Sequence, residues 1–191
     1  QLLNTVVQSL DNMVFVEGGE FQMGDFGWKC DYDPSNMCEW PCGAEPERLC
    51  NISMDGDDDF VHPVKLSSYY LSKFQTTIRD FDLFFIAQGK PLYDAEDRKR
   101  EDIQFLYTPN NPAPPKSWDE AKDYCNWLGK LSGYPVDLPS EAQWEYACRA
   151  GTKTPYHFGE TIMPDIANYR DKKKNSPEQT TAVGSYRLAN A

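Results

Sequence analysis

The stretch that decides the fold reads LPSEAQWEYACRAG and spans residues 138–151. Pro139 restricts the backbone just before Ser140, and a glutamine three residues after that serine completes the pattern of a capping box. We therefore expect a helix that begins after Ser140 and ends at Gly151. One face of this helix would carry Trp144 and the cysteine four residues after it.

Three further helices are expected on similar grounds. SWDE at residues 117–120 is a second capping box and predicts a helix over 118–131. Thr77 precedes an apolar run over 78–89 that ends in glycine, and the aromatic stripe of that run is expected in the core: Phe81, Phe84 and Phe85. Residues 1–12 carry apolar side chains at helical spacing and predict a short helix.

Short strands surround these helices. Residues 13–24 alternate around Gly18 and Gly19 and predict a hairpin, residues 62–73 predict a strand, and residues 182–186 predict a short one. The charged segment 90–107 is expected on the surface. The fold class is α+β with modest regular structure, and 191 residues suit a single domain over 1–191.

A polar insertion at residues 25–60 interrupts this pattern. It holds four of the six cysteines: Cys30, Cys38, Cys42 and Cys50. Their spacing does not repeat a CxxC knuckle, so disulfides in an oxidising compartment are favoured over zinc. We accordingly expect an extracytoplasmic protein, periplasmic or secreted, and interpret Gln1 as a processed or cloned start. The other two, Cys125 and Cys148, either pair with each other or are buried thiols.

Charge and motifs narrow the function. A net charge of −11 argues against nucleic acid and anionic membranes and favours a cation or a basic protein surface. No apolar run is long enough to span a bilayer. The acidic run at 55–59 lacks EF-hand spacing and is better interpreted as a solvated turn. The two histidines, His62 and His157, form no HExxH motif, and neither a GxSxG elbow nor a phosphate-binding loop is present.

The order of several segments carries a resemblance to a known family. They are FVEGGEFQMG at 15–24, HPV at 62–64, SWDEA at 117–121, YCNWL at 124–128, LPSEAQWEYA at 138–147, RAG at 149–151, FG at 158–159, AN at 167–168 and VGS at 183–185. In this order they resemble the formylglycine-generating enzyme (sulfatase-modifying factor) domain family. The resemblance covers most of the chain outside the 25–60 insertion.

The resemblance implies a variant of the C-type lectin fold, often with bound calcium. In the family, a catalytic half with a copper-binding cysteine pair follows the VGS segment, and soft thiolates suit Cu(I). Cys125 and Cys148 match scaffold positions of the family instead. We therefore expect no catalytic residue in this chain. We interpret the chain either as a fragment of a longer family member, with an incomplete domain, or as a shortened, non-catalytic relative.

The family's first calcium site falls inside the chain. The resemblance maps its ligands onto Asn168, Tyr169, Asn175 and Pro177, through side-chain amides and backbone carbonyls. Such hard oxygen ligands suit calcium, although Asn175 replaces an aspartate and removes a negative charge. The alternative that both asparagines are turn residues stays open.

Two functional hypotheses follow. The first is a non-catalytic, exported protein-binding module that recognises another protein through the 25–60 loop, as an accessory, regulatory or immunity protein of a bacterial secretion system. The alternative is a fragment of a copper-dependent formylglycine-generating oxidoreductase or of a related iron-dependent sulfoxide synthase. A third idea, sugar binding, rests on lectin analogy alone.

Overall fold

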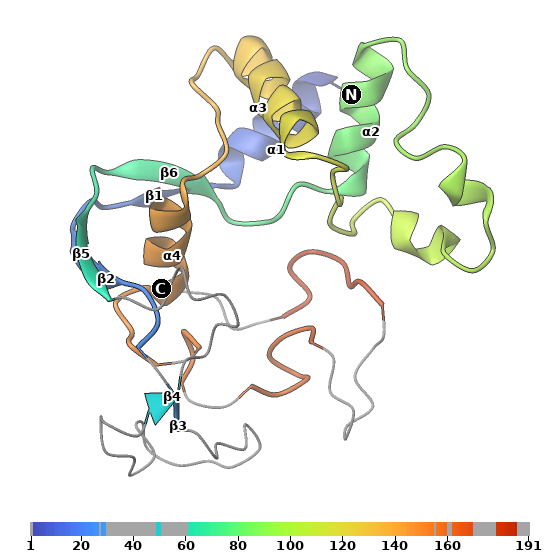
Figure 1. The fold of residues 1–191 in the computed structure, drawn as a ribbon. Coiled ribbons are helices and arrows are strands. Elements are labelled where there is room, and N and C mark those ends of the chain that lie inside the picture. The colour runs from blue at the N-terminus through green and yellow to red at the C-terminus, as the bar shows by residue number, and fades with distance from the viewer. Residues whose placement is uncertain are drawn as a thin grey trace. The chain divides into compact units, whose positions relative to one another are not determined.

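The computed structural model describes residues 2–26, 28–29, 49–50, 61–154, 156–159, 162–169 and 179–186, with only the backbone at 28–29 and 49–50. The chain divides into two compact units (Figure 1). Unit 1 comprises Gln1–Phe15, Tyr70–Leu138 and Asn168–Ser185. Unit 2 comprises Val16–Tyr69, Pro139–Ala167 and Tyr186–Ala191.

Unit 1 is built on three helices, α1 (Leu2–Asp11), α2 (Ile78–Ala87) and α3 (Trp118–Ser132), with α1 and α2 both in contact with α3. Two short 3-10 helices, η2 (Asp97–Lys99) and η3 (Gln104–Tyr107), follow α2. All three predicted helices of this unit are thus confirmed. The buried apolar side chains form one cluster: Val6, Ile78, Phe81, Phe84, Tyr93, Tyr124, Cys125 and Leu128.

The helix starts follow the predicted caps. Thr77 and Asp80 form a complete capping box at α2, with each side chain bonded to the other's backbone nitrogen. At α3, the Ser117 hydroxyl accepts from the Glu120 nitrogen, but the Glu120 carboxylate accepts from the nitrogen of Lys116 instead. The Thr77 and Ser117 hydroxyls thus bond donors that the first helical turn leaves without partners.

Phe81 lies at the centre of the aromatic core. Its ring stacks on Tyr124 at 5.2 Å and meets Tyr93 edge-on, also at 5.2 Å. Tyr93 is only 1% exposed, although it belongs to the charged segment expected on the surface. Asp82 accepts a hydrogen bond from the Tyr93 nitrogen and pairs with Arg98, which fastens this segment over the core. The surface prediction for 90–107 is therefore wrong at Tyr93.

The predicted 13–24 hairpin is also wrong. Strand β1 (Met13–Val16) pairs with β6 (Tyr69–Ser72), whereas β2 (Glu20–Met23) pairs antiparallel with β5 (His62–Lys65). A Cβ atom at Gly18 would lie 2.5 Å from the Leu66 carbonyl oxygen. Gly18 therefore permits a close approach of two backbones rather than a tight turn.

Unit 2 contains the β2–β5 pair, helix α4 (Glu141–Arg149), and a short antiparallel pair of β3 (Trp28–Lys29) and β4 (Leu49–Cys50). The signature stretch thus forms the helix predicted for it, with Ala150 and Gly151 both at positive φ where α4 ends. The single strand predicted over 62–73 is split between β5 and β6. The strand predicted at 182–186 is a turn, in which Gly184 has a φ of 74°.

Across the described residues, none of the helices has the length and apolar character needed to traverse a bilayer.

Candidate functional site

Helix α4 packs against strand β2 and also accepts a hydrogen bond from Tyr69. The Tyr146 ring packs edge-on against Phe21 at 5.0 Å, and its hydroxyl occupies the space that a Cβ atom at Gly19 would need. The Tyr69 hydroxyl donates a 2.6 Å hydrogen bond to the Gln143 carbonyl. The local cap, in which Ser140 and Gln143 bond each other's backbone nitrogens, orients the helix start. The signature stretch is therefore a docking helix for the strand that precedes the insertion.

An ion pair on α4, formed by Glu145 and Arg149, is hydrogen-bonded to the backbone of Gly24 at the end of β2. We call these three residues the Gly24 clamp. Glu145 Oε1 accepts from the Gly24 nitrogen at 3.1 Å and from Arg149 Nε at 2.7 Å. Arg149 Nη2 donates to the Gly24 carbonyl at 2.8 Å, and its guanidinium lies 4.7 Å from the Phe26 ring centroid. Both backbone groups of Gly24 are thereby bonded to α4.

The clamp relies on helical spacing and on glycine. Glu145 and Arg149 are four residues apart with the acid first, the favourable order for a helical ion pair. Gly24 has a φ of 125°, a conformation that other residues rarely adopt. Both charged side chains are only about a fifth exposed, which limits solvent screening of the pair. The four-residue spacing of Glu145 and Arg149 is visible in the sequence, but their contact with Gly24 is not.

The insertion begins just after the clamp. Strands β3 and β4 pair antiparallel with Trp28 opposite Cys50 and Lys29 opposite Leu49. Within the insertion, Lys29 and Leu49 therefore lie on adjacent strands. The flanks of the whole insertion are brought together by the β2–β5 pair, in which Met23 lies opposite His62. Helix α4, through the Gly24 clamp, and the β2–β5 pair together define the base of the insertion.

The cysteine predictions have separate outcomes. Cys30, Cys38 and Cys42 lie outside the described residues, as does the side chain of Cys50, so disulfides in the insertion stay a prediction. Cys125 is a free thiol, 8% exposed, in the unit 1 core. Of the two alternatives for Cys125, the buried thiol is therefore the correct one. Burial raises the pKa of its thiol above the ordinary value.

Only half of the predicted calcium ligands can be located. Asn168 is exposed, and its Nδ2 donates to the Gln179 carbonyl at 2.9 Å, which leaves Oδ1 as an acceptor. Tyr169 is half-buried, while Asn175 and Pro177 lie outside the described residues. No three His, Cys, Asp or Glu side chains gather as a metal site in the parts of the chain that the structure covers.

Together, the capped helices and small two-stranded sheets define a mixed helix-and-sheet protein of low regular structure. The structure of PvdO from Pseudomonas aeruginosa has a similar fold, with a TM-score of 0.63 at 23% identity over 94% of this chain and 64% of that one. The model of the sulfatase-modifying factor enzyme 1-like domain family matches residues 1–191. The chain belongs to this family, as the resemblance of its motifs predicted.

Two curated relatives illustrate the family's range. A formylglycine-generating enzyme from Thermomonospora curvata is 39% identical over 190 residues, which cover 80% of this chain and 54% of that protein. An inactive C-alpha-formylglycine-generating enzyme 2 from Bos taurus is 36% identical over 70 residues, covering 36% of this chain and 19% of that protein. The chain thus spans about half or less of these relatives.

Proposed function

We propose that the chain is a non-catalytic, exported protein-binding module that presents the 25–60 insertion to a partner protein. The observation that carries the proposal is the base of the insertion. The Gly24 clamp holds the chain where the insertion begins, and the β2–β5 pair, with Met23 opposite His62, brings the flanks of the insertion together. A loop held by a rigid scaffold is the usual arrangement for recognition.

Charge indicates the kind of partner. The insertion holds ten Asp and Glu residues but only Lys29 and Arg48 as cations, so it contributes most of the chain's net charge of −11. An acidic loop of this kind favours a partner with a basic surface and accelerates its association at low salt. An accessory, regulatory or immunity protein of a secretion system is one setting for such a pair.

Deletion of the loop tests the proposal. Residues 30–48 are replaced by a short Gly-Ser link between Lys29 and Leu49, and wild type and variant are used as bait with material from the native source. Partners are identified by mass spectrometry and then titrated as purified proteins. We expect loss of binding with unchanged far-UV circular dichroism, and affinity that falls with salt. Equal recovery of the same partner by the variant would refute the role of the loop.

Export is tested separately through the cysteines. Our expectation is that Cys30, Cys38, Cys42 and Cys50 are disulfide-bonded, since exported proteins meet an oxidising compartment. Protein from the native source is alkylated under denaturing conditions, with and without prior reduction. Alkylation of all four without reduction would contradict both the disulfides and the export.

Calcium remains part of the proposal through Asn168, Tyr169, Asn175 and Pro177. The exposed Asn168 supports it, because its Oδ1 is a hard oxygen that a calcium ion can accept as a ligand. Calorimetric titration with calcium should give one site in the wild type and none in Asn168→Ala. Asn110→Ala, also in unit 1, serves as the control; identical heats for all three proteins would remove calcium from the proposal.

The alternative is that the chain is part of a copper-dependent formylglycine-generating oxidoreductase or of an iron-dependent sulfoxide synthase. It is favoured by the 39% identity with the Thermomonospora enzyme. The whole gene product, loaded with either metal, should then oxidise a cysteine-containing substrate. Without turnover under either condition, this alternative fails.

A further inference from the structure

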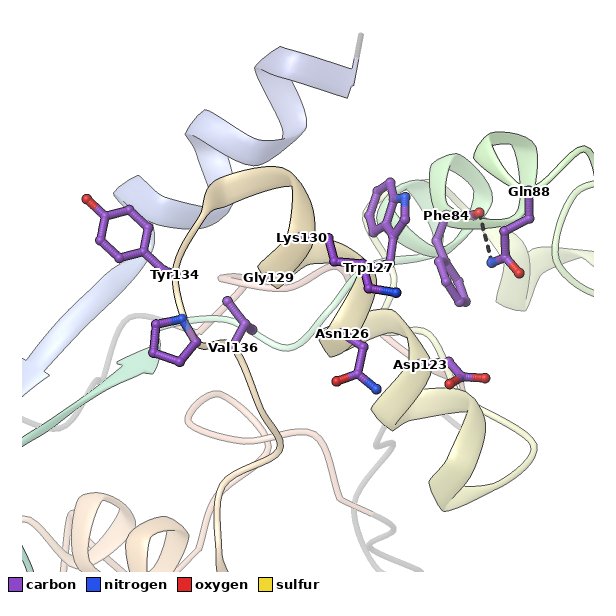
Figure 2. Close-up of a pocket in the computed structure, with 10 residues that line it drawn as sticks. Phe84, Gln88, Asp123, Asn126, Trp127, Gly129, Lys130, Tyr134 and Val136 are labelled. Carbon is purple, nitrogen blue, oxygen red and sulfur yellow. Dashed lines mark hydrogen bonds between the residues drawn. The ribbon is translucent and has the colours of Figure 1, made fainter.

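A groove in unit 1 has no role in the proposed function. It has a volume of about 570 Å³ and lies between α2, α3 and the loop that follows α3 (Figure 2). Phe84 and Gln88 come from α2, and Tyr134, Pro135 and Val136 come from the loop. Its lining combines aromatic rings with charged and amide side chains, which is typical of a binding surface.

Helix α3 contributes one continuous stripe to this groove. Positions three, four and seven residues after Asp123 lie on the same face of a helix, and all four line the groove: Asp123, Asn126, Trp127 and Lys130. A different face of α3 packs into the core through Tyr124, Cys125 and Leu128. The same helix therefore has one buried stripe and one stripe turned towards the groove.

Gly129 shapes the wall of the groove. A glycine in a helix interior costs about 1 kcal/mol relative to alanine. Here a Cβ atom would lie 3.0 Å from the Tyr134 carbonyl oxygen and 3.4 Å from the Val136 nitrogen. Glycine therefore lets the loop close onto α3, and this contact places Tyr134, 62% exposed, at the edge of the groove.

The polar groups of the groove contrast with those of a second hollow in unit 1. In that hollow, Lys116 pairs with Asp94 through its side chain, and Glu120 accepts from the Lys116 nitrogen. In the groove, Asp123 and Lys130 form no ion pair with any other residue that the structure describes. In the second hollow Lys116 and Asp94 are thus paired with each other, whereas Asp123 and Lys130 of the groove are exposed.

We propose that the groove binds an extended peptide segment of a partner protein. The partly exposed Trp127 ring, which packs 5.5 Å from the buried Phe84 ring, would receive an apolar side chain. The exposed Asn126 carries an amide that matches the donors and acceptors of a peptide backbone, whereas Gln88 Nε2 donates to the Phe84 carbonyl, which leaves Gln88 Oε1 as an acceptor. Asp123 and Lys130 are about 10 Å apart along the helix axis, so they complement a segment with a cation at one end and an anion at the other.

Capped pentapeptides test this inference with the full chain. The probes are lysine-alanine-X-alanine-glutamate, with leucine, phenylalanine or tryptophan at X, since alternate side chains of an extended segment share one face. Like-charge peptides with two lysines or two glutamates are the controls. Binding is followed by NMR at the Trp127 indole and at the Asn126 and Gln88 side-chain amides. We expect the mixed-charge peptides to shift these signals and to bind at least about fivefold more tightly than the controls.

Charge reversals make the test specific. Asp123→Lys or Lys130→Asp should each weaken the mixed-charge peptides about fivefold, because one end then meets a like charge. The double variant should restore binding, since a peptide can enter in the opposite direction. Glu101→Lys, at an exposed residue of unit 1 outside the groove, is the charge-matched control.

Three results would overturn the inference: no shift at millimolar peptide, equal weakening by Glu101→Lys, or no recovery in the double variant. Each can occur while deletion of residues 30–48 still abolishes partner binding. The groove and the insertion therefore succeed or fail independently.

Discussion

The two units are stabilised by different kinds of contact. Unit 1 packs buried aromatic side chains around Phe81, and every buried apolar residue of the described chain belongs to it. In the described part of unit 2, no residue is fully buried, and α4 is held to β2 by one ring contact and the Gly24 clamp. Apolar burial gives unit 1 its stability, whereas directional polar contacts give unit 2 a defined loop position.

The largest effect is expected in the aromatic core. Phe81→Ala should reduce the free energy of unfolding by about 3–5 kcal/mol, because it removes a ring that touches several others and leaves a cavity. Urea denaturation measures the change. Ile86→Ala, on the exposed side of the same helix, should cost less than about 1 kcal/mol. Similar costs for the two variants would mean that this core does not dominate stability.

A smaller and more local effect is expected at the clamp. Glu145→Ala leaves the Gly24 nitrogen and Arg149 Nε without their acceptor and should cost about 1–3 kcal/mol. Hydrogen exchange at the Gly24 amide should accelerate about tenfold. Glu141→Ala, in the exposed first turn of α4, should leave this amide unchanged. If Gly24 exchanges equally in both variants, the clamp does not fix the base of the insertion.

Cys125 provides a reporter for the independence of the two units. Its buried thiol, whose pKa is raised by burial, should react slowly with iodoacetamide in the folded protein. Phe81→Ala should accelerate this reaction, because it loosens the core that covers the thiol. Glu145→Ala should leave the rate unchanged. Acceleration by both variants would show that unit 1 depends on the clamp.

The smallest effect concerns His157 in unit 2. Its Nε2 is buried without a hydrogen bond to any described residue, and burial lowers the pKa of its imidazole. Since the folded pKa lies below the unfolded value of about 6.5, its stabilising contribution is present above that pH. That contribution is lost as the pH falls through the folded pKa. His157→Asn should flatten the acid side of a plot of Tm against pH; an unchanged slope would exclude His157 as the cause.

Helix positions were predictable because their signals are local. Thr77, Ser117 and Ser140 each cap a helix within three residues of sequence, and the Phe81 stripe marks a buried face. Strand pairing was not predictable, because β1 and β2 are adjacent in sequence but pair with β6 and β5. Gly18 resembles a turn residue, yet it serves a backbone contact with Leu66.

Some features of the candidate site were likewise predictable from the sequence, and others were not. The sequence by itself determined the family, the docking helix and the acidic, cysteine-rich loop, because these depend on composition and short spacing. Only the tertiary structure decided that Glu145 and Arg149 grip Gly24, and that one stripe of α3 faces a groove. Both arrangements join residues distant in the chain, and such contacts depend on packing that no local pattern encodes.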